Sequence, residues 1–115
     1  MRTEELTGAA LDWAVASIEL TGHDDYTNVL MVTVGDDNDW KYNPSTDWAQ
    51  GGAIIEREMI ELVPVTGALW EAYKRNQHIP SDGATPLIAA MRCYVASKLG
   101  DEVELPEELL SCAHD

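Results

Sequence analysis

The stretch TPLIAAMRCYVASKLG, residues 85–100, contains the clearest secondary-structure signal in the sequence. Thr85 stands at the position of a helix N-cap, Pro86 at the first helical position, and Gly100 directly after the expected end. Apolar side chains recur at helical spacing on one face, namely Leu87, Ala90, Met91, Tyr94 and Val95. Small residues form a second face, which would admit a close neighbour or a second copy of the chain: Ala89, Cys93 and Ala96. The stretch therefore predicts a tightly packed helix over residues 86–99.

Two further helices are expected upstream of this stretch. The first covers residues 7–19, with Thr7 as its N-cap and with Asp12 and Glu19 on its solvent edge. The second begins after Asp47, which would cap it with Gln50 as capping-box partner. One face of this second helix would carry Trp48, Gly51, Gly52, Ile55 and Met59.

Three segments read as extended structure. Residues 28–34 are branched and apolar, which is typical of a buried strand. Residues 60–65 alternate weakly around Pro64, which favours an edge strand, and residues 66–76 favour a strand over a helix. Residues 106–110 indicate a short terminal turn. The sequence therefore predicts one α+β domain over residues 1–115, with two to three short antiparallel strands packed against about three helices.

The charge of the chain restricts its partners. Seven Lys plus Arg against twenty-one Asp plus Glu give a formal net charge of −14. Such a protein is not expected to bind nucleic acid over a broad face or to bind an anionic membrane. The apolar fraction of 45% nevertheless predicts a folded core. We find neither a secretory signal nor an apolar run of the ~20 residues that span a bilayer.

Residue types that commonly carry catalysis or metals do not form a convincing pattern. Cys93 and Cys112 are expected to be reduced, and no histidine lies at helical spacing from a cysteine or another histidine. The acidic residues 36–39 lack the Gly and Glu positions of a calcium loop. No serine or cysteine has an evident base partner. We therefore expect a non-enzymatic protein without a metal or cofactor.

Residues 42–55 carry the best candidate for a binding site. Two glycines inside a helix cost about 1 kcal/mol each relative to alanine, so they indicate a close approach to the backbone. Stacking faces, hydroxyls and first-turn N–H groups near these glycines suit a small ligand. The candidate ligand-binding residues of this segment are Tyr42, Ser45, Thr46, Asp47, Trp48, Gly51 and Gly52. The alternative is that Trp48 and Ile55 belong to the core and that the glycines admit a neighbouring helix.

Arg92 is the eighth candidate residue, because it is the one charged residue between Asp82 and Lys98. An arginine on a buried helix needs a carboxylate partner or an anionic ligand. Two hypotheses follow. Arg92 forms a structural pair with Asp12, Asp47 or Glu56, or it neutralises a phosphate or carboxylate of a ligand.

Three motifs resemble those of a known family. They are LTGAALDWAVA at residues 6–16, YNPSTDWAQGGAII at residues 42–55 and TPLIAAMR at residues 85–92. In this order they resemble the NinX family of small phage and prophage proteins, over about residues 6–109. Where the family commonly has Pro this chain has Ala53, which leaves open a later helix start and a loop at residues 48–52. The resemblance implies a phage-encoded accessory protein in the cytoplasm of an infected bacterium.

Two functions are consistent with these observations. The first is capture of a small anionic, nucleotide-like ligand, in the way that several compact phage proteins sequester nucleotide signals of host defence systems. The second is an acidic protein-interaction module, an inhibitor or DNA mimic that covers a basic host surface. The ligand-binding hypothesis rests on Trp48, the two glycines and Arg92, whereas the second hypothesis rests on the net charge.

Overall fold

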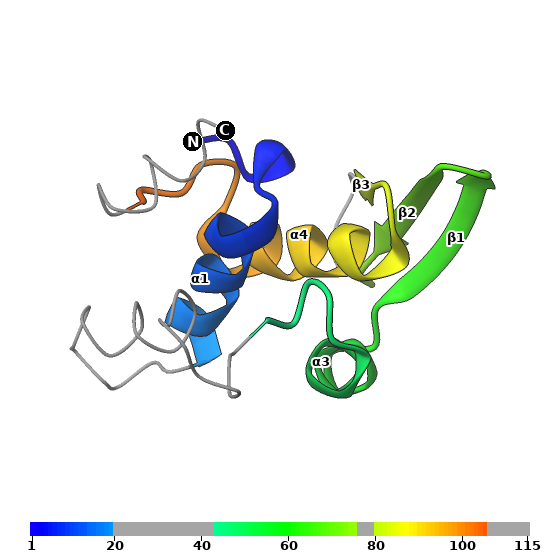
Figure 1. Cartoon of the computed structure of the whole chain (residues 1–115), viewed down its shortest axis with the longest axis horizontal. Coiled ribbons are helices and arrows are strands. Elements are labelled where there is room, and N and C mark those ends of the chain that lie inside the picture. Colours follow the sequence, from blue (N-terminus) through cyan, green and yellow to red (C-terminus); the bar gives the residue numbers. More distant parts are fainter. Residues whose placement is uncertain (20–42, 76–79, 106–115) are drawn as a thin grey trace.

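The described structure is organised around its last helix. The computed structural model describes residues 1–19, 43–75 and 80–105, so the strand expected at 28–34 and the turn expected at 106–110 lie outside the described residues. The elements, shown in Figure 1, are η1 (Thr3–Glu5), α1 (Gly8–Glu19), α3 (Trp48–Glu58), β1 (Glu61–Thr66), β2 (Leu69–Tyr73), β3 (Ser81–Gly83) and α4 (Pro86–Leu99). Helix α4 contacts each of the other six.

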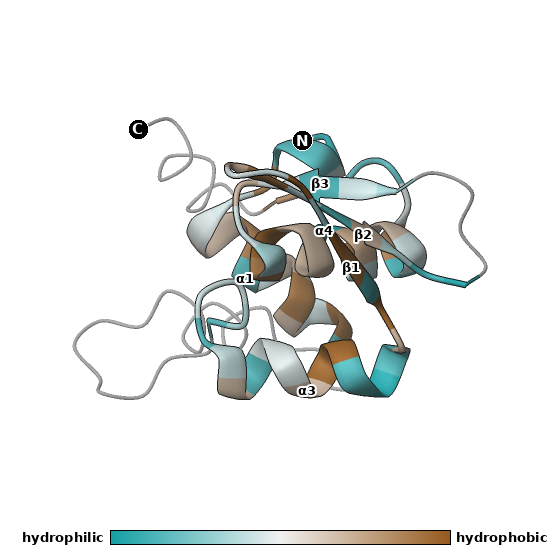
Figure 2. Cartoon of the chain, turned by 90° about the vertical axis from the view of Figure 1, so that its right-hand side faces the viewer, coloured by the Kyte–Doolittle hydropathy of each residue, from teal (hydrophilic) through white to brown (hydrophobic). Residues whose placement is uncertain are grey.

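The ends of α4 follow the predicted signals. The Thr85 Oγ1 accepts a hydrogen bond from the backbone N–H of Ile88 at 3.1 Å, and Pro86 occupies the first turn. Gly100 follows the helix with a φ of 87°, a left-handed value that favours glycine. The side chains buried along α4 are Leu87, Ala89, Ala90, Met91, Cys93, Tyr94 and Val95. Because they occupy more than one face, α4 is covered on several sides, as in Figure 2.

The three strands form an antiparallel sheet in the order β1-β2-β3. Ala72 pairs with Leu62 on one side and with Ser81 on the other, and it is fully buried in the core that includes α4. Strand β1 is an edge strand, as predicted from Pro64, while the predicted strand over 66–76 is confirmed as β2. Strand β3 was not predicted, because its three residues are Ser81, Asp82 and Gly83 and none has an apolar side chain.

Helix α1 packs on α4 away from the sheet (Figure 1). Its buried residues run without interruption from Ala10 to Ala16, so the helix is covered on more than one side. The fold class is therefore the predicted α+β arrangement of three helices and an antiparallel sheet.

The first residues of the chain are tied to the segment that follows α4. The Thr3 N–H donates to the Asp101 carbonyl at 2.8 Å, and the Thr3 hydroxyl donates to the Gly100 carbonyl at 2.6 Å. The Val103 N–H donates to the Met1 carbonyl at 2.8 Å, beside an antiparallel bridge between Arg2 and Glu102. These bonds hold η1 against the C-terminal end of α4.

The small residues of α4 admit a close neighbour, which is one of the two alternatives expected for them. Ala89 and Cys93 are 0% exposed in the single chain, so they do not offer a face to a second copy. The close neighbour is β3: a Cβ added to Gly83 would lie 2.7 Å from the Ala89 backbone nitrogen and 2.7 Å from Ile88 Cγ2. The small residue at position 89 therefore admits a strand of the same chain.

Gly51 marks a second close approach, between α3 and the chain around it. A Cβ at Gly51 would lie 2.4 Å from the Pro44 carbonyl oxygen and 2.6 Å from Leu87 Cδ2. A Cβ at Gly52 would meet Trp48 Cε3 at an ordinary 3.6 Å. Gly51 is thus required by packing, which confirms for this residue the alternative that it admits a neighbouring helix.

The two glycines provide a matched pair for a stability test. We expect Gly51→Ala to destabilise the protein by about 1–3 kcal/mol, because backbone cannot yield to the added methyl group without shifting α3. Gly52→Ala is expected to stabilise it by about 1 kcal/mol through helix propensity. Urea unfolding of the two variants checks both signs. Equal effects of the two substitutions would contradict the packing role of Gly51.

Candidate ligand-binding site

The segment before α3 is held by a buried carboxylate. Asp12, on α1, is 6% exposed, and its Oδ1 accepts a hydrogen bond from the Ser45 backbone N–H at 2.8 Å. The prediction that Asp12 lies on a solvent edge is therefore wrong. Asp12 is the one charged residue in the buried stretch of α1. Its burial is tolerated because the carboxylate accepts a hydrogen bond from a backbone amide of a distant loop.

Asp47 caps α3 as predicted. Its side chain accepts from the Ala49 N–H at 2.9 Å, and its own N–H donates to the Asn43 carbonyl at 2.9 Å. The predicted capping-box role of Gln50 is wrong. Its Oε1 accepts a hydrogen bond from the Asn43 N–H at 2.6 Å, which connects the start of the preceding loop to α3. Helix α3 begins at Trp48, so the alternative of a loop over 48–52 is also wrong, and Ala53 is exposed within the helix.

The buried face of α3 differs from the predicted one. Gly51 and Ile54 are buried, whereas Trp48 is 55% exposed. Met59 lies beyond the last helical residue, in a left-handed conformation, and is also exposed. Trp48 is therefore not a core residue.

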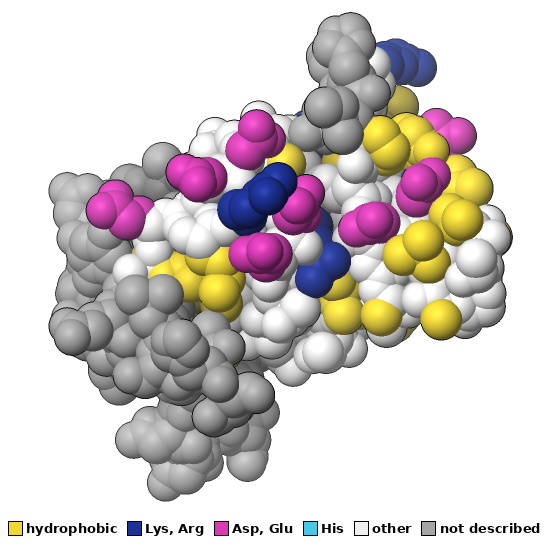
Figure 3. Space-filling view, turned by 90° about the horizontal axis from the view of Figure 1, so that it is seen from above, with side chains coloured by type: hydrophobic (Ala, Val, Ile, Leu, Met, Phe, Trp, Pro, Cys, Tyr) yellow, Lys and Arg dark blue, Asp and Glu magenta, His cyan; other side chains and the backbone are white. Residues whose placement is uncertain are grey.

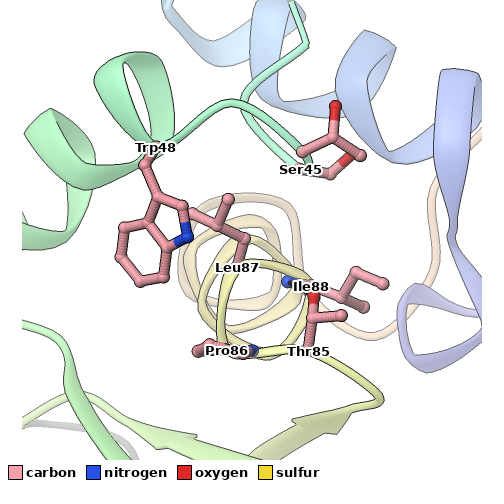
Figure 4. Close-up of a pocket in the computed structure, with 7 residues that line it drawn as sticks. Ser45, Trp48, Thr85, Pro86, Leu87 and Ile88 are labelled. Atoms are coloured by element: carbon pink, nitrogen blue, oxygen red, sulfur yellow. Dashed lines mark hydrogen bonds between the residues drawn. The ribbon is translucent and has the colours of Figure 1, made fainter.

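A hollow of about 230 Å³ lies where the starts of α3 and α4 meet. It is lined by Ser45, Thr46, Trp48, Thr85, Pro86, Leu87 and Ile88. Figure 4 shows the Trp48 indole on one side of it, with its ring nitrogen directed toward Leu87, and the first turn of α4 opposite. The structure thus brings together three of the predicted residues, Ser45, Thr46 and Trp48.

Hydroxyls and helix starts give the hollow its polar character. Ser45 is 2% exposed, and its Oγ has no hydrogen-bond partner among the described residues. The caps satisfy the N–H groups of Ala49 and Ile88, whereas those of Trp48 and Leu87, in the same first turns, have no acceptor within their helices. The starts of two helices carry partial positive charge, which favours an electron-rich group of a ligand.

The remaining predicted residues do not contribute to the hollow in the expected way. The Gly51 N–H donates to the Asp47 carbonyl at 2.8 Å, so it is not available for a ligand, and Gly52 is not among the lining residues. Asp47 acts as the cap of α3. Tyr42 lies outside the described residues.

Arg92 lies away from the hollow and binds backbone. Its Nε donates to the Leu6 carbonyl and its Nη1 to the Asp82 carbonyl, both at 2.8 Å. Burial lowers the pKa of Arg92, and the carboxylates of Asp82 and Glu4 oppose this effect. Arg92 therefore has a structural role, as the first hypothesis stated. Its partners are two backbone carbonyls, which connect η1 and β3 to α4, and not the expected carboxylates of Asp12, Asp47 or Glu56.

Sequence reasoning missed the α4 side of the hollow. Thr85 and Pro86 were recognised as helix-start residues, yet nothing in the sequence placed them beside Trp48. The available signal was a general one: the first backbone N–H groups of every helix have no acceptor within that helix.

A separate charged cluster joins α1, α3, β2 and α4. Arg57 makes a bidentate pair with Glu19, with N–O distances of 3.0 and 2.7 Å, and the Tyr94 hydroxyl hydrogen-bonds to both. Lys74 and Arg57 each donate to Glu58 at 2.9 Å. Hydrogen bonds from Arg57 lower the pKa of Glu19, and those from Lys74 and Arg57 lower that of Glu58. Every member has a partner within the cluster, so it acts as a structural connection.

Other reactive groups are buried or scattered. Burial raises the pKa of the Cys93 thiol to about 11, so the thiol is protonated at neutral pH and is a poor nucleophile. Within residues 1–19, 43–75 and 80–105, no group of three His, Cys, Asp or Glu side chains could hold a metal ion. No helix in the same residues is long and apolar enough to cross a membrane.

Comparison with known families gives a match over most of the chain. A family model described as Bacteriophage P22, NinX matches residues 2–98, which include all the described elements except the last residue of α4. No curated protein matches the chain.

The Glu19 pair predicts a dependence of stability on pH. A carboxyl group with a lowered folded pKa stabilises the protein above its ordinary pKa of 4.5 and loses this effect as the pH falls through the folded value. We expect Glu19→Gln to lose about 1–2 kcal/mol at neutral pH, and the difference from wild type to shrink below pH 4.5. Urea unfolding as a function of pH measures this.

Glu56→Gln is the control, because Glu56 is exposed on α3 and the substitution changes the net charge equally. It should shift stability by little at any pH. A constant difference between wild type and Glu19→Gln across the acid range would contradict the paired role of Glu19.

Proposed function

Because the chain belongs to the bacteriophage P22 NinX family, we propose that it is a phage-encoded accessory protein that binds a small anionic, nucleotide-like ligand without catalysis. It acts in the cytoplasm of the infected bacterium, where removal of such a ligand would counter host defence signalling. The observation that carries the proposal is the hollow between the starts of α3 and α4, with the half-exposed indole of Trp48 at its side.

The geometry supports this role in three ways. An indole that is 55% exposed beside a concavity offers a ring face for stacking, at a position where core packing does not require it. The first turns of two helices provide N–H donors for an acceptor or anionic group. The hydroxyl-bearing residues Thr46 and Thr85 also line the hollow and add groups that can hydrogen-bond to a ligand.

The size of the hollow limits the ligand. A volume of about 230 Å³ is below that of a pocket enclosing a drug-sized molecule, for which about 300–1,000 Å³ is usual. The hollow therefore accommodates one ring system, and the rest of the ligand would extend over the surface.

Replacement of Trp48 tests the proposal. We expect Trp48→Ala to weaken binding by about five- to 150-fold, since a base stacked on an aromatic ring contributes about 1–3 kcal/mol. The free energy of unfolding should change little, because the side chain is mostly exposed. Calorimetry and native mass spectrometry against a panel of nucleosides and nucleotides measure the first effect, and urea unfolding measures the second.

Val65→Ala is the matched control. Val65 is 48% exposed on the edge strand β1, so the substitution also truncates an exposed apolar side chain but at a distance from the lining residues. It should leave binding unchanged. The proposal is refuted if no compound of the panel binds wild type, or if Trp48→Ala and Val65→Ala bind as wild type does.

A second candidate function follows from one acidic face. Seen from above (Figure 3), acidic side chains gather over the molecule, with Lys and Arg between them. The exposed acids of η1, β3 and the segment after α4 are Glu4, Glu5, Asp82, Asp101, Glu102 and Glu104. The hydrogen bond from the Thr3 N–H to the Asp101 carbonyl holds two of these segments together. This face would suit a basic protein surface.

Charge removal distinguishes the two functions. The variant carrying Glu4→Gln, Glu5→Gln, Asp101→Asn and Glu102→Gln should lose a protein partner whose binding weakens steeply with salt. The same variant should retain small-ligand binding, because none of these residues lines the hollow. If partner binding survives the four substitutions, this second function is wrong.

A further inference from the structure

We infer that the hollow selects a planar heteroaromatic ligand with no more than one negative charge, such as a nucleoside or a nucleoside phosphodiester, and discriminates against multiply charged nucleotides. This inference rests on the proposed function and specifies the ligand class of the same site. The inference rests on the lining residues of the hollow, which provide an aromatic ring for stacking and hydrogen-bonding groups but include no Lys or Arg.

The lining supplies apolar contact and hydroxyls but no charge. Apolar contact comes from Trp48 and from Pro86, Leu87 and Ile88 of α4. Three hydroxyl-bearing residues accompany them, namely Ser45, Thr46 and Thr85. Neither a Lys nor an Arg is among these residues. A ring with polar edges matches this mixture better than a chain of phosphates does.

Three cations of the described chain are held by partners outside the hollow. Arg92 is held by the carbonyls of Leu6 and Asp82, while Arg57 and Lys74 are paired with Glu19 and Glu58. Among the lining residues, a triphosphate would therefore meet no positive charge other than the helix-start dipoles, each equivalent to roughly half a charge. That is enough for one anionic group and too little for several.

The negative charge of the whole protein also disfavours ligands with several negative charges. The formal net charge is −14, and one acid, Asp47, directly precedes Trp48 in the chain. Each added phosphate charge would be repelled by this field, and the repulsion decreases as salt shortens the Debye length from about 30 Å at 0.01 M to about 10 Å at 0.1 M. Ligand affinity should thus fall as ligand charge rises, most steeply at low salt.

The test is a charge series on a common ring. Adenosine, guanosine, cytidine and thymidine, each with its mono-, di- and triphosphate, are titrated into wild type by calorimetry at 0.01 M and 0.15 M salt. For the base that binds best, we expect the triphosphate to bind at least tenfold more weakly than the nucleoside at low salt, with a smaller ratio at high salt. The monophosphate should lie between the nucleoside and the diphosphate.

A charge-gain variant makes the test sharper. Thr46 is exposed and lines the hollow, so Thr46→Lys places a cation at the site and should raise triphosphate affinity relative to the nucleoside by severalfold. Ala68→Lys changes the net charge equally in the exposed turn between β1 and β2 and should change this ratio much less. Equal ratios in the two variants would overturn the inference.

The outcomes separate this inference from the proposed function. If affinity rises with each phosphate in wild type, the low-charge preference is wrong, whereas the ligand site proposed above stands. If no member of the series binds, both fail. Binding that falls with charge but is unaffected by Trp48→Ala would place the ligand elsewhere and would also overturn the inference.

Discussion

The hydrogen bond between the Asp12 carboxylate and the Ser45 amide connects two parts of the chain that are 33 residues apart. Asp12 lies within the buried stretch of α1, where an unpaired carboxylate would be strongly unfavourable. The pairing therefore fixes the loop at residues 43–47 on α1. Asp47 then caps α3, and the Pro44 carbonyl lies so close to Gly51 that a side chain does not fit. The position of α3 relative to α4 depends on this sequence of contacts.

The hollow is a consequence of the same arrangement. With Leu87 of α4 packed near Gly51, the first turns of the two helices face a common space, and Trp48 at the start of α3 stands at its side (Figure 4). The side chains of Asp47 and Thr85 cap the two helix starts from within the chain itself. The site combines apolar contact with hydrogen-bonding groups in a strongly acidic protein, and this combination determines which ligands it favours.

The sequence predicted the elements with strong local signals. Helix α4 was recognised from Thr85, Pro86 and Gly100, and the edge position of β1 from Pro64, because each of these residues restricts the backbone directly. Strand β3 has no such signal, since its pairing with β2 and its approach to Ala89 are tertiary effects.

The candidate site was predicted in part. Ser45, Thr46 and Trp48 were found because hydroxyls and an indole stand at a helix start. Arg92 was recognised as unusual, but a lone arginine in a sequence does not reveal that its acceptors are backbone carbonyls. Asp12 was misplaced because helical periodicity treats a charge as exposed, whereas its acceptor role arises only from a distant amide.

The central claim is that Asp12 holds the loop that forms the site, and hydrogen exchange at the Ser45 amide tests it most directly. In wild type this amide should be protected. In Asp12→Ala it should exchange at least about tenfold faster, because loss of a hydrogen bond to a charged acceptor costs about 1.5–3 kcal/mol. The amides of Met91 to Val95 in α4 should stay protected, which would show that the effect is local. Unprotected exchange of the Ser45 amide in wild type, or an unchanged rate in a folded Asp12→Ala, would contradict the account.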